Sequence, residues 1–414
     1  MTAYGTQGQT VEFDTETTLG TALGSAIDLK VEEKTFPTKT TQVIENNPLG
    51  RENWANKSDK PITYEAVQED AISITCNCRV NADNDDQLTK MATIGGFETD
   101  AADDTTCAIT SGTINTVSNV AKPGRAHLVQ LDTSGLYYPV LGAATETDGA
   151  VAITMNPPTD ATAGNACLEM TTIYPQQAET ALYGNFKWNT RGANTAANKL
   201  AYRASGCALA SIGTISIEPN TPLKFQLGFH AAKIDQIVDE MNAESMGFLD
   251  KVPVTNCNFE FGFAASSDSW SIANTKASLI KADIDLNYSC VPISAIGNSC
   301  VNGVQGYFAK PGVPKITLDM IMDKAKWDDF EGTNPDKYLH FVQPTSAVST
   351  TPVPAWGFWF PKCHLIDCPE MISEGDYYRM TLVYEAHSAG FESTTTNNSQ
   401  GMSPWYHAVG GYKA

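Results

Sequence analysis

Residues 374–387 read EGDYYRMTLVYEAH. After the acidic turn, apolar side chains alternate with polar ones, and a period of two residues is that of a half-buried β-strand. One face of this strand would carry Tyr378, Met380, Leu382 and Tyr384. The opposite face would carry Arg379, Thr381, Val383 and Glu385. The stretch is therefore expected to cover an apolar core with one face and to leave the other face for a different use.

A second stretch, residues 223–231 (LKFQLGFHA), repeats this pattern and aligns without a gap with residues 378–386 (YRMTLVYEA). The matched pairs are Lys224 and Arg379, Phe225 and Met380, Leu227 and Leu382, Phe229 and Tyr384, and Ala231 and Ala386. Upstream, Cys207 falls on Cys363 and Glu218 on Glu374 once a one-residue difference in the turn is allowed. Since internal repeats reveal architecture, the sequence predicts one hairpin used twice.

A weaker similarity links residues 72–78 and 83–92 with residues 316–322 and 323–332. In both places a predicted strand leads into a predicted short acidic helix. The rest of the chain is rich in short alternating runs bounded by Gly, Asn, Asp and Pro, which is typical of a mainly β protein. Three short helices are expected, namely Asp85–Met91, Asp323–Glu331 and Ile234–Met241. The last has apolar residues at helical spacing and would serve as a linker.

The region 101–180 begins with an acidic, Ala/Thr-rich segment and then has strand patterns of its own, such as CLEMTTIY. We interpret it as a small β domain inserted into the first repeat. The predicted division of the chain is a first domain of 1–100 and 181–233, the insertion 101–180, a linker 234–250, a second domain 251–390 and a C-terminal arm 391–414. Trp405, Tyr406 and Tyr412 indicate that this arm docks on another surface.

The chain of 414 residues has a formal net charge of -20 and a pI near 4.6. A protein without a basic excess is not expected to bind phosphate backbones. The sequence has no long apolar run of the kind that crosses a membrane, and it does not begin with a secretory signal pattern. Its 10 cysteines include no C-x-x-C pair, so we expect buried, reduced thiols and no zinc site.

Catalytic patterns are absent as well. There is no nucleophile elbow and no glycine-rich phosphate loop. Cys363 and His364 are neighbours on a strand, where they would point to opposite faces and could not act as a pair. The acidic run 81–86 lacks the glycine and glutamate of an EF-hand loop. We therefore expect a protein that is not an enzyme and has no cofactor or metal.

Several stretches resemble the major tail tube proteins of long-tailed (siphovirus-type) bacteriophages, in the form that has two tube domains in one chain. They are GCALASIGTISIEPNTPLKFQLGFHA, KCHLIDCPEMISEGDYYRMTLVYEA, FEFGFAASSDSWSIANTKASLIKADIDLNYSCVPI, GVQGYFAKPGVPKITLDM and WDDFEGTNPDKYLHF. The resemblance covers residues 181–390 well and residues 10–180 in patches. It implies two β-sandwich or half-barrel domains, each with a short flanking helix.

The resemblance also implies a function. Three such chains would form a pseudo-hexameric ring, the sheets would join side to side, and the rings would stack into a tube in the virion, assembled in the host cytoplasm. Expected partners are other copies of the chain and the tail terminator and tail-tip proteins, whereas the tape measure protein and DNA would pass through the lumen without specific binding. The terminal arms would bridge successive rings, and the insertion would decorate the outside.

Within that scheme, the polar face of each hairpin would line the lumen or join neighbouring subunits. The candidate residues are Glu218, Lys224, Gln226, Glu374, Asp376, Arg379, Thr381 and Glu385. Negative groups facing a lumen would repel DNA and let it slide. Two alternatives remain open on sequence alone: a tail-tip or baseplate ring protein of the same domain family, and a β-rich surface adhesin or glycan-binding module.

Overall fold

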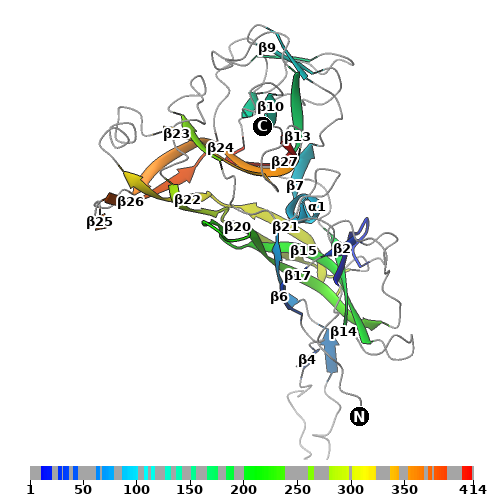
Figure 1. The fold of residues 1–414 in the computed structure, drawn as a ribbon. Coiled ribbons are helices and arrows are strands. Elements are labelled where there is room, and N and C mark those ends of the chain that lie inside the picture. Colours follow the sequence, from blue (N-terminus) through cyan, green and yellow to red (C-terminus); the bar gives the residue numbers. More distant parts are fainter. Residues whose placement is uncertain are drawn as a thin grey trace, which may run out of the picture.

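The protein is seen here in a computed structural model. It describes residues 11–20, 27–29, 31–36, 41–44, 62–65, 68–78, 86–100, 107–110, 113–116, 126–131, 137–141, 151–154, 166–175, 183–190, 200–237, 260–264, 279–297, 301–322, 336–344, 353–367, 372–374, 377–388 and 403–412. These residues form mainly β-strands, arranged in two large curled sheets (Figure 1). The expectation of a mainly β chain with half-barrel sheets is confirmed at this level.

The first sheet contains what we call the first repeat, a run of six neighbouring strands. In spatial order they are β1 (Val11–Thr15), β14 (Gly184–Thr190), β15 (Leu200–Ile212), β17 (Lys224–Ile237), β6 (Gln68–Asn77) and β3 (Glu33–Thr35). Strand β2 (Ile27–Leu29) extends the sheet beyond β1. All pairings in this run are antiparallel.

The second sheet contains the second repeat, which has the same strand order. Its strands are β18 (Glu260–Ala264), β23 (Asp336–Pro344), β24 (Val353–Asp367), β26 (Tyr377–Ala386), β22 (Lys315–Met322) and β19 (Leu279–Asp285). These pairings are antiparallel too. One six-stranded pattern therefore occurs twice in the chain, and each strand of the second repeat has a counterpart in the first.

The two repeats agree down to the register of their central hairpin. Cys207 lies opposite Ala231 in β15–β17, and Cys363 lies opposite Ala386 in β24–β26. Each hairpin has an irregularity at the same place, at Ala210 in one and at Ile366 in the other. The predicted repeat of the hairpin is thus confirmed. The strands of the weaker similarity, 72–78 and 316–322, are also equivalent in register, since β6 pairs with β17 as β22 pairs with β26.

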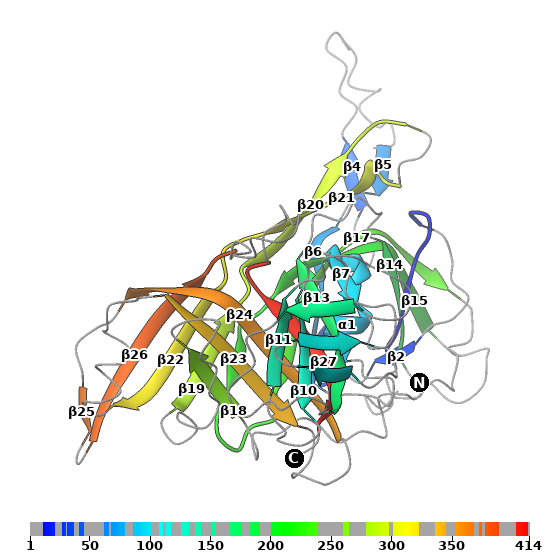
Figure 2. The ribbon, with the colours of Figure 1, turned by 90° about the horizontal axis from the view of Figure 1, so that it is seen from above.

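Two further pairs of strands are inserted at matching positions. In the first repeat, β4 (Thr41–Ile44) and β5 (Ile62–Glu65) form a separate hairpin between β3 and β6. In the second repeat, β20 (Tyr288–Ser294) and β21 (Val304–Pro311) form a hairpin between β19 and β22. Figure 2 shows the latter continuing the line of β19 and β22 toward the first repeat. Asn287, with φ +48°, lies at the bend between β19 and β20.

The helix predictions have three outcomes. The helix expected at 85–91 is present as α1 (Gln87–Lys90), followed by a 3-10 turn at Thr93–Gly95. The helix expected at 323–331 lies outside the described residues. The helix expected from Ile234 is wrong where it is described, because Ile234–Ile237 are the end of β17 and pair with residues 201–204 of β15. There, strand pairing overrides an apolar spacing that also fits a helix.

The strand pattern CLEMTTIY of the insertion lies in β13 (Ala166–Pro175), as predicted. The other strands of the insertion are β8 (Cys107–Thr110), β9 (Thr113–Thr116), β10 (Ala126–Leu131), β11 (Tyr137–Leu141) and β12 (Val151–Thr154). The start of β13 pairs with β8 and β10, and its end pairs with β7 (Phe97–Asp100). Strand β13 therefore carries the insertion into the second sheet.

The C-terminal segment corrects one expectation. Residues 406–412 form β27, which lies between β13 and β24 (Figure 1). Trp405 and Tyr406 are buried, so the docking that these aromatic residues indicated takes place on the chain itself. β27 pairs with the part of β24 that β26 does not reach, which is the place that the longer β17 fills in the first repeat. These residues are part of a sheet and are not available as an arm between rings.

The cysteine prediction holds for the five cysteines that are described as free. Cys76, Cys78, Cys207, Cys290 and Cys363 are all buried. Burial raises the pKa of the Cys76 thiol to about 12, with smaller contributions from nearby carboxylates. These thiols are protonated at neutral pH and act as small apolar core residues.

Candidate functional site

The polar side of the two repeats is the candidate site, and it is defined by strand alternation. We call polar face the residues of β3, β6, β17, β19, β22 and β26 that alternate with core residues. They are Glu33, Thr35, Ser73, Thr75, Lys224 and Gln226 in the first repeat, and Lys281, Asp283, Asp285, Lys315, Thr317, Asp319, Arg379, Thr381 and Glu385 in the second. Their neighbours Leu227 and Leu382 are fully buried, as the alternation predicts.

Most of the candidate residues predicted from the sequence lie on this face or at its rim. Lys224 and Gln226 are exposed on β17, and Arg379, Thr381 and Glu385 are partly exposed on β26. Glu218 follows a short strand, β16 (Ile215–Ile217), and reaches the same face. Glu374 ends the corresponding strand of the second repeat, β25 (Ile372–Glu374), and only its backbone is described. Asp376 lies outside the described residues.

The two repeats are joined at this face by β16 and β19. Ile215 pairs with Ile284, Ser216 with Asp283 and Ile217 with Ala282, so β16 of the first repeat extends the sheet of the second. The isoleucines of β16 are buried while Ser216 points to the polar side. A three-residue strand in the turn of one hairpin thus joins two sheets edge to edge.

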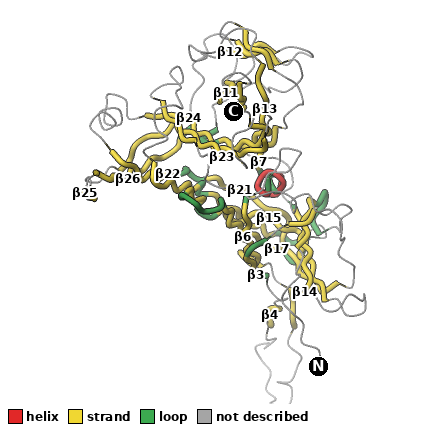
Figure 3. Tube along the Cα trace, viewed as in Figure 1, coloured by secondary structure: helices red, strands yellow, loops and turns green. Residues whose placement is uncertain are grey.

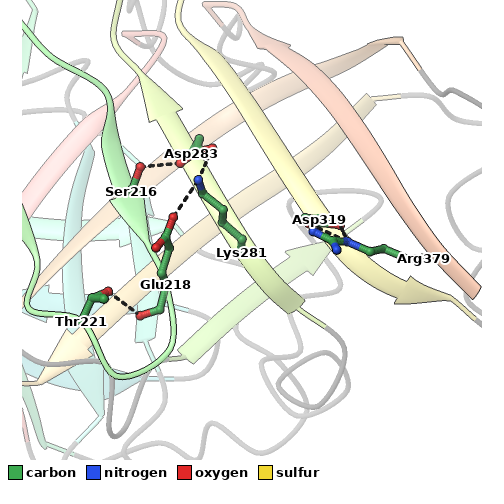
Figure 4. A network of polar contacts seen from close by, with 7 residues as sticks. All are labelled: Ser216, Glu218, Thr221, Lys281, Asp283, Asp319 and Arg379. Carbon is green, nitrogen blue, oxygen red and sulfur yellow. Dashed lines mark hydrogen bonds and ion pairs between the residues drawn. The ribbon is translucent and has the colours of Figure 1, made fainter. Parts of the chain in front are cut away.

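Ion pairs reinforce this joint (Figure 4). The ammonium Nζ of Lys281 lies 2.7 Å from a carboxylate oxygen of Glu218 and 3.1 Å from one of Asp283. The hydroxyl of Ser216 donates a hydrogen bond to Asp283. Hydrogen bonds to Glu218 and Asp283 raise the pKa of Lys281, which therefore stays charged. The joint is held by backbone pairing and by a cation shared between two carboxylates.

A second ion pair lies deeper in the second repeat. The guanidinium of Arg379 donates two hydrogen bonds from Nε to the carboxylate of Asp319, at 2.7 and 2.9 Å, and a third from Nη2. Asp319 faces Thr381 in register and is the more buried partner, with 12% of its side chain exposed against 36% for Arg379. Two planar groups in this geometry form a strong, oriented pair.

A row of ionisable side chains also crosses the second repeat. In register, Asp285 faces Lys315, Lys315 faces Glu385, Glu385 faces His364, and His364 faces Asp336. Lys315 and Glu385 lie 3.8 Å apart, and Nδ1 of His364 lies 2.8 Å from Asp336. Burial raises the pKa of Asp336, but the bond with His364 and the nearby Lys362 outweigh it, so the net pKa is lowered. Cross-strand pairs of opposite charge stabilise a sheet.

The geometry changes the expected electrostatics of the face. The sequence suggested negative groups that would repel DNA, but in the structure Glu218 and Glu385 each lie beside a lysine. The partners Lys281, Lys315 and Asp319 were not among the candidates, although the alternation in KADIDLNY and KITLDM places them on the outer side of two predicted strands. Their pairing depends on which strands are neighbours, and that comes from the fold.

Replacing Arg379 with alanine should lower the free energy of unfolding by about 1–3 kcal/mol, because the nearly buried Asp319 loses its hydrogen-bond donor. A urea titration measures this. Lys224→Ala is the matched control: it is the same position in the first repeat, exposed and without an ion pair among the described residues. It should change stability by less than about 0.5 kcal/mol. Equal effects of the two substitutions would contradict the role given to the Arg379–Asp319 pair.

In comparisons with known proteins, no protein-family model and no curated protein matches the chain. Among the described residues there is no cluster of three or more potential metal ligands. In the same residues, no helix is long and apolar enough to cross a membrane.

Proposed function

We propose that the chain is a structural virion protein that polymerises as stacked rings of three chains to form the tail tube of a long-tailed bacteriophage. The observation that carries this proposal is the joint between β16 and β19. It shows that one repeat can extend the sheet of another through backbone hydrogen bonds and a short strand. A chain that joins two copies of a sheet in this way has the means to join more.

The ends of the sheets support the same conclusion. Open sheet edges are a liability for a protein that stays monomeric, because they pair with other chains. Strand β3 ends the first sheet and pairs only with β6 among the described residues. In a ring of three chains, six repeats would be joined edge to edge, and the edges would be removed by closure, as in a barrel.

The charge pattern suits a conduit for DNA. Of the four Lys and Arg residues of the polar face, Lys281, Lys315 and Arg379 each contact a carboxylate, whereas Lys224 has no ion pair among the described residues. Cations that are already paired within the protein have little to gain from phosphate, since binding requires free Lys or Arg to displace counterions from DNA. With a net charge of -20, the whole chain adds repulsion. In this proposal the face lets DNA slide and does not hold it.

Electron microscopy of the purified protein tests the proposal. Negatively stained samples at increasing concentration should contain rings or tubes whose averaged end views have threefold symmetry with six similar lobes. Light scattering should rise with concentration as the rings stack. A protein that stays monomeric at high concentration, and binds a glycan, would refute the tail tube and favour a surface-binding module. Single rings that never stack would favour a tail-tip ring protein.

A further inference from the structure

Each of the two strands that form the joint between the repeats has an equivalent strand in the other repeat. In the described structure these two equivalents do not pair with each other. By hairpin alignment, β25 is the equivalent of β16, and by register β3 is the equivalent of β19. Within one chain, β16 meets β19. Among the described strands, β25 pairs only with β26, where Ile372 faces Arg379. β3 has β6 on one side and no described strand on the other.

We propose that β25 of one chain pairs with β3 of the next, so that the contact between chains repeats the joint within each chain. This proposal rests on the proposed function and specifies its subunit interface. The register follows from the template. Ser216 corresponds to Ile372, and Asp283 corresponds to Thr35, because Thr35 faces Ser73 as Asp283 faces Thr317. Ile372 of one chain therefore lies opposite Thr35 of the next.

A second observation supports the same contact. In the first repeat, the cross-strand pair Ala208 and His230 is covered by the hairpin β20–β21. Nε2 of His230 lies 2.7 Å from the Cys290 carbonyl oxygen, and its ring stacks on Tyr307. The hydroxyl of Tyr307 donates to the carbonyl of Gly206. The hairpin β20–β21 of the second repeat therefore packs on the first repeat, in addition to the strand pairing between β16 and β19. We call this hairpin the clasp.

The equivalent place in the second repeat has no such cover. It is the pair His364 and Glu385, whose side chains are 47% and 29% exposed. The equivalent of the clasp is the hairpin β4–β5, which pairs with no other described strand and projects from the body in Figure 1. If β3 of one chain pairs with β25 of a neighbouring chain, the hairpin β4–β5 would lie on the second repeat of that neighbour as β20–β21 lies on the first repeat. It would cover His364 and Glu385 of that neighbour.

Such a contact is head-to-tail, since it joins two different surfaces, and a head-to-tail contact closes into a ring when its rotation fits. The joint between chains also differs from the internal one in charge. Glu33 takes the place of Lys281, and Glu374 that of Glu218. With a glutamate in the place of Lys281, the contact lacks the cation of the internal joint and is weaker than that joint. The chain is thereby kept soluble until its concentration or a growing tube brings the ends together.

Disulfide trapping tests the register. In the variant Thr35→Cys, Ile372→Cys, oxidation of assembled protein should give covalent dimers and trimers on a non-reducing gel. A closed ring cannot go beyond three chains. Each single variant carries the same native thiols and should give monomer only. The variant Ser216→Cys, Asp283→Cys is the matched control and should form its disulfide within one chain. β3 and β25 lie well apart in Figure 3, so a bond within one chain does not compete.

Two further measurements sharpen the result. Glu33→Lys added to the double-cysteine variant should raise the yield of cross-linked chains about two- to fivefold, the size of one exposed ion pair. A His364→Cys thiol should react with a maleimide in unassembled protein and be protected in tubes. Tubes that form without this cross-link, or with no effect of Glu33→Lys, would overturn the β3–β25 contact and leave the tube function standing. Equal labelling of His364→Cys in tubes and in free chains would overturn the clasp. Absence of any assembly would refute the proposed function itself.

Discussion

Replacing Asp86 with alanine should lower the free energy of unfolding by about 3–5 kcal/mol, the usual cost of breaking a buried ion pair from one side. Asp86 and His407 are both fully buried, and Nε2 of His407 lies 2.8 Å from the carboxylate. The same carboxylate caps α1 by accepting a hydrogen bond from the Thr89 N–H. One side chain therefore ties the first helix to the C-terminal strand β27.

The arrangement around His407 explains why the loss is large. Its other ring nitrogen, Nδ1, lies 3.0 Å from the carbonyl oxygen of Gly357 on β24, and its ring packs at 4.5 Å from that of Phe358. Without Asp86 the imidazole keeps that fixed place but loses its charged partner in a site that water does not reach. Unpaired buried polar groups of this kind are costly.

Two variants separate the contributions. Asp86→Asn keeps a good N-cap residue and removes the charge, so its cost should fall below that of alanine. Asp336→Ala removes a carboxylate from an exposed contact with His364 and should cost less than about 1 kcal/mol. Urea titrations followed by tryptophan fluorescence measure all three. A cost for Asp86→Ala as small as for Asp336→Ala would contradict the idea that the pair anchors β27.

The pair also makes stability depend on pH. Burial raises the pKa of Asp86, but the charge and hydrogen bond of His407 outweigh it, so its pKa in the folded state is lowered. A group of this kind contributes its stability above its pKa in the unfolded chain, about 3.9, and loses it as the pH falls through the folded pKa. The melting temperature of the native protein should therefore decrease when the pH is lowered below about 4. The decrease should be smaller in Asp86→Asn.

The link between Asp86 and His407 illustrates what the sequence could not reveal. They are 321 positions apart, and no local pattern pairs them. The aromatic residues beside His407 did indicate a docking segment, but they did not say that the docking surface is the chain's own β24. Likewise, Glu218 was a candidate residue, but its pairing with Lys281 was not predicted, because β16 and β19 belong to different repeats. Contacts between repeats depend on packing that alternation does not encode.

What the sequence did predict came from local periodicity that the fold preserves. The hairpins 207–231 and 363–386 have the same register because their apolar residues must face the same core. The error at Ile234 has the opposite cause. Ile234 and Ile237, the two described residues of this apolar spacing, lie in a strand because β15 is long enough to pair with them through residues 201–204. Tertiary pairing decided between two locally acceptable structures.

Replacing Phe229 with alanine should cost about 3–5 kcal/mol, and replacing Tyr384 should cost a similar amount, because both deletions leave a large cavity. Phe229 and Tyr384 are matched positions of the two hairpins and both are fully buried. The ring of Phe229 lies 4.7 Å from that of Phe186 on β14. If the repeats share one architecture, the two substitutions act on the same structural position and their effects on stability should be comparable.

The neighbouring residues of the same strands provide the control. Gln226 and Thr381 are matched positions on the polar face, and alanine at either should change stability by less than about 0.5 kcal/mol. Calorimetry of the four single variants, at a concentration below the onset of assembly, measures the two pairs under equal conditions. Comparable losses at Gln226 and Phe229 would mean that both faces of β17 are packed in the isolated chain. The polar face would then be unavailable for a lumen, and the tail tube proposal would lose the surface it needs.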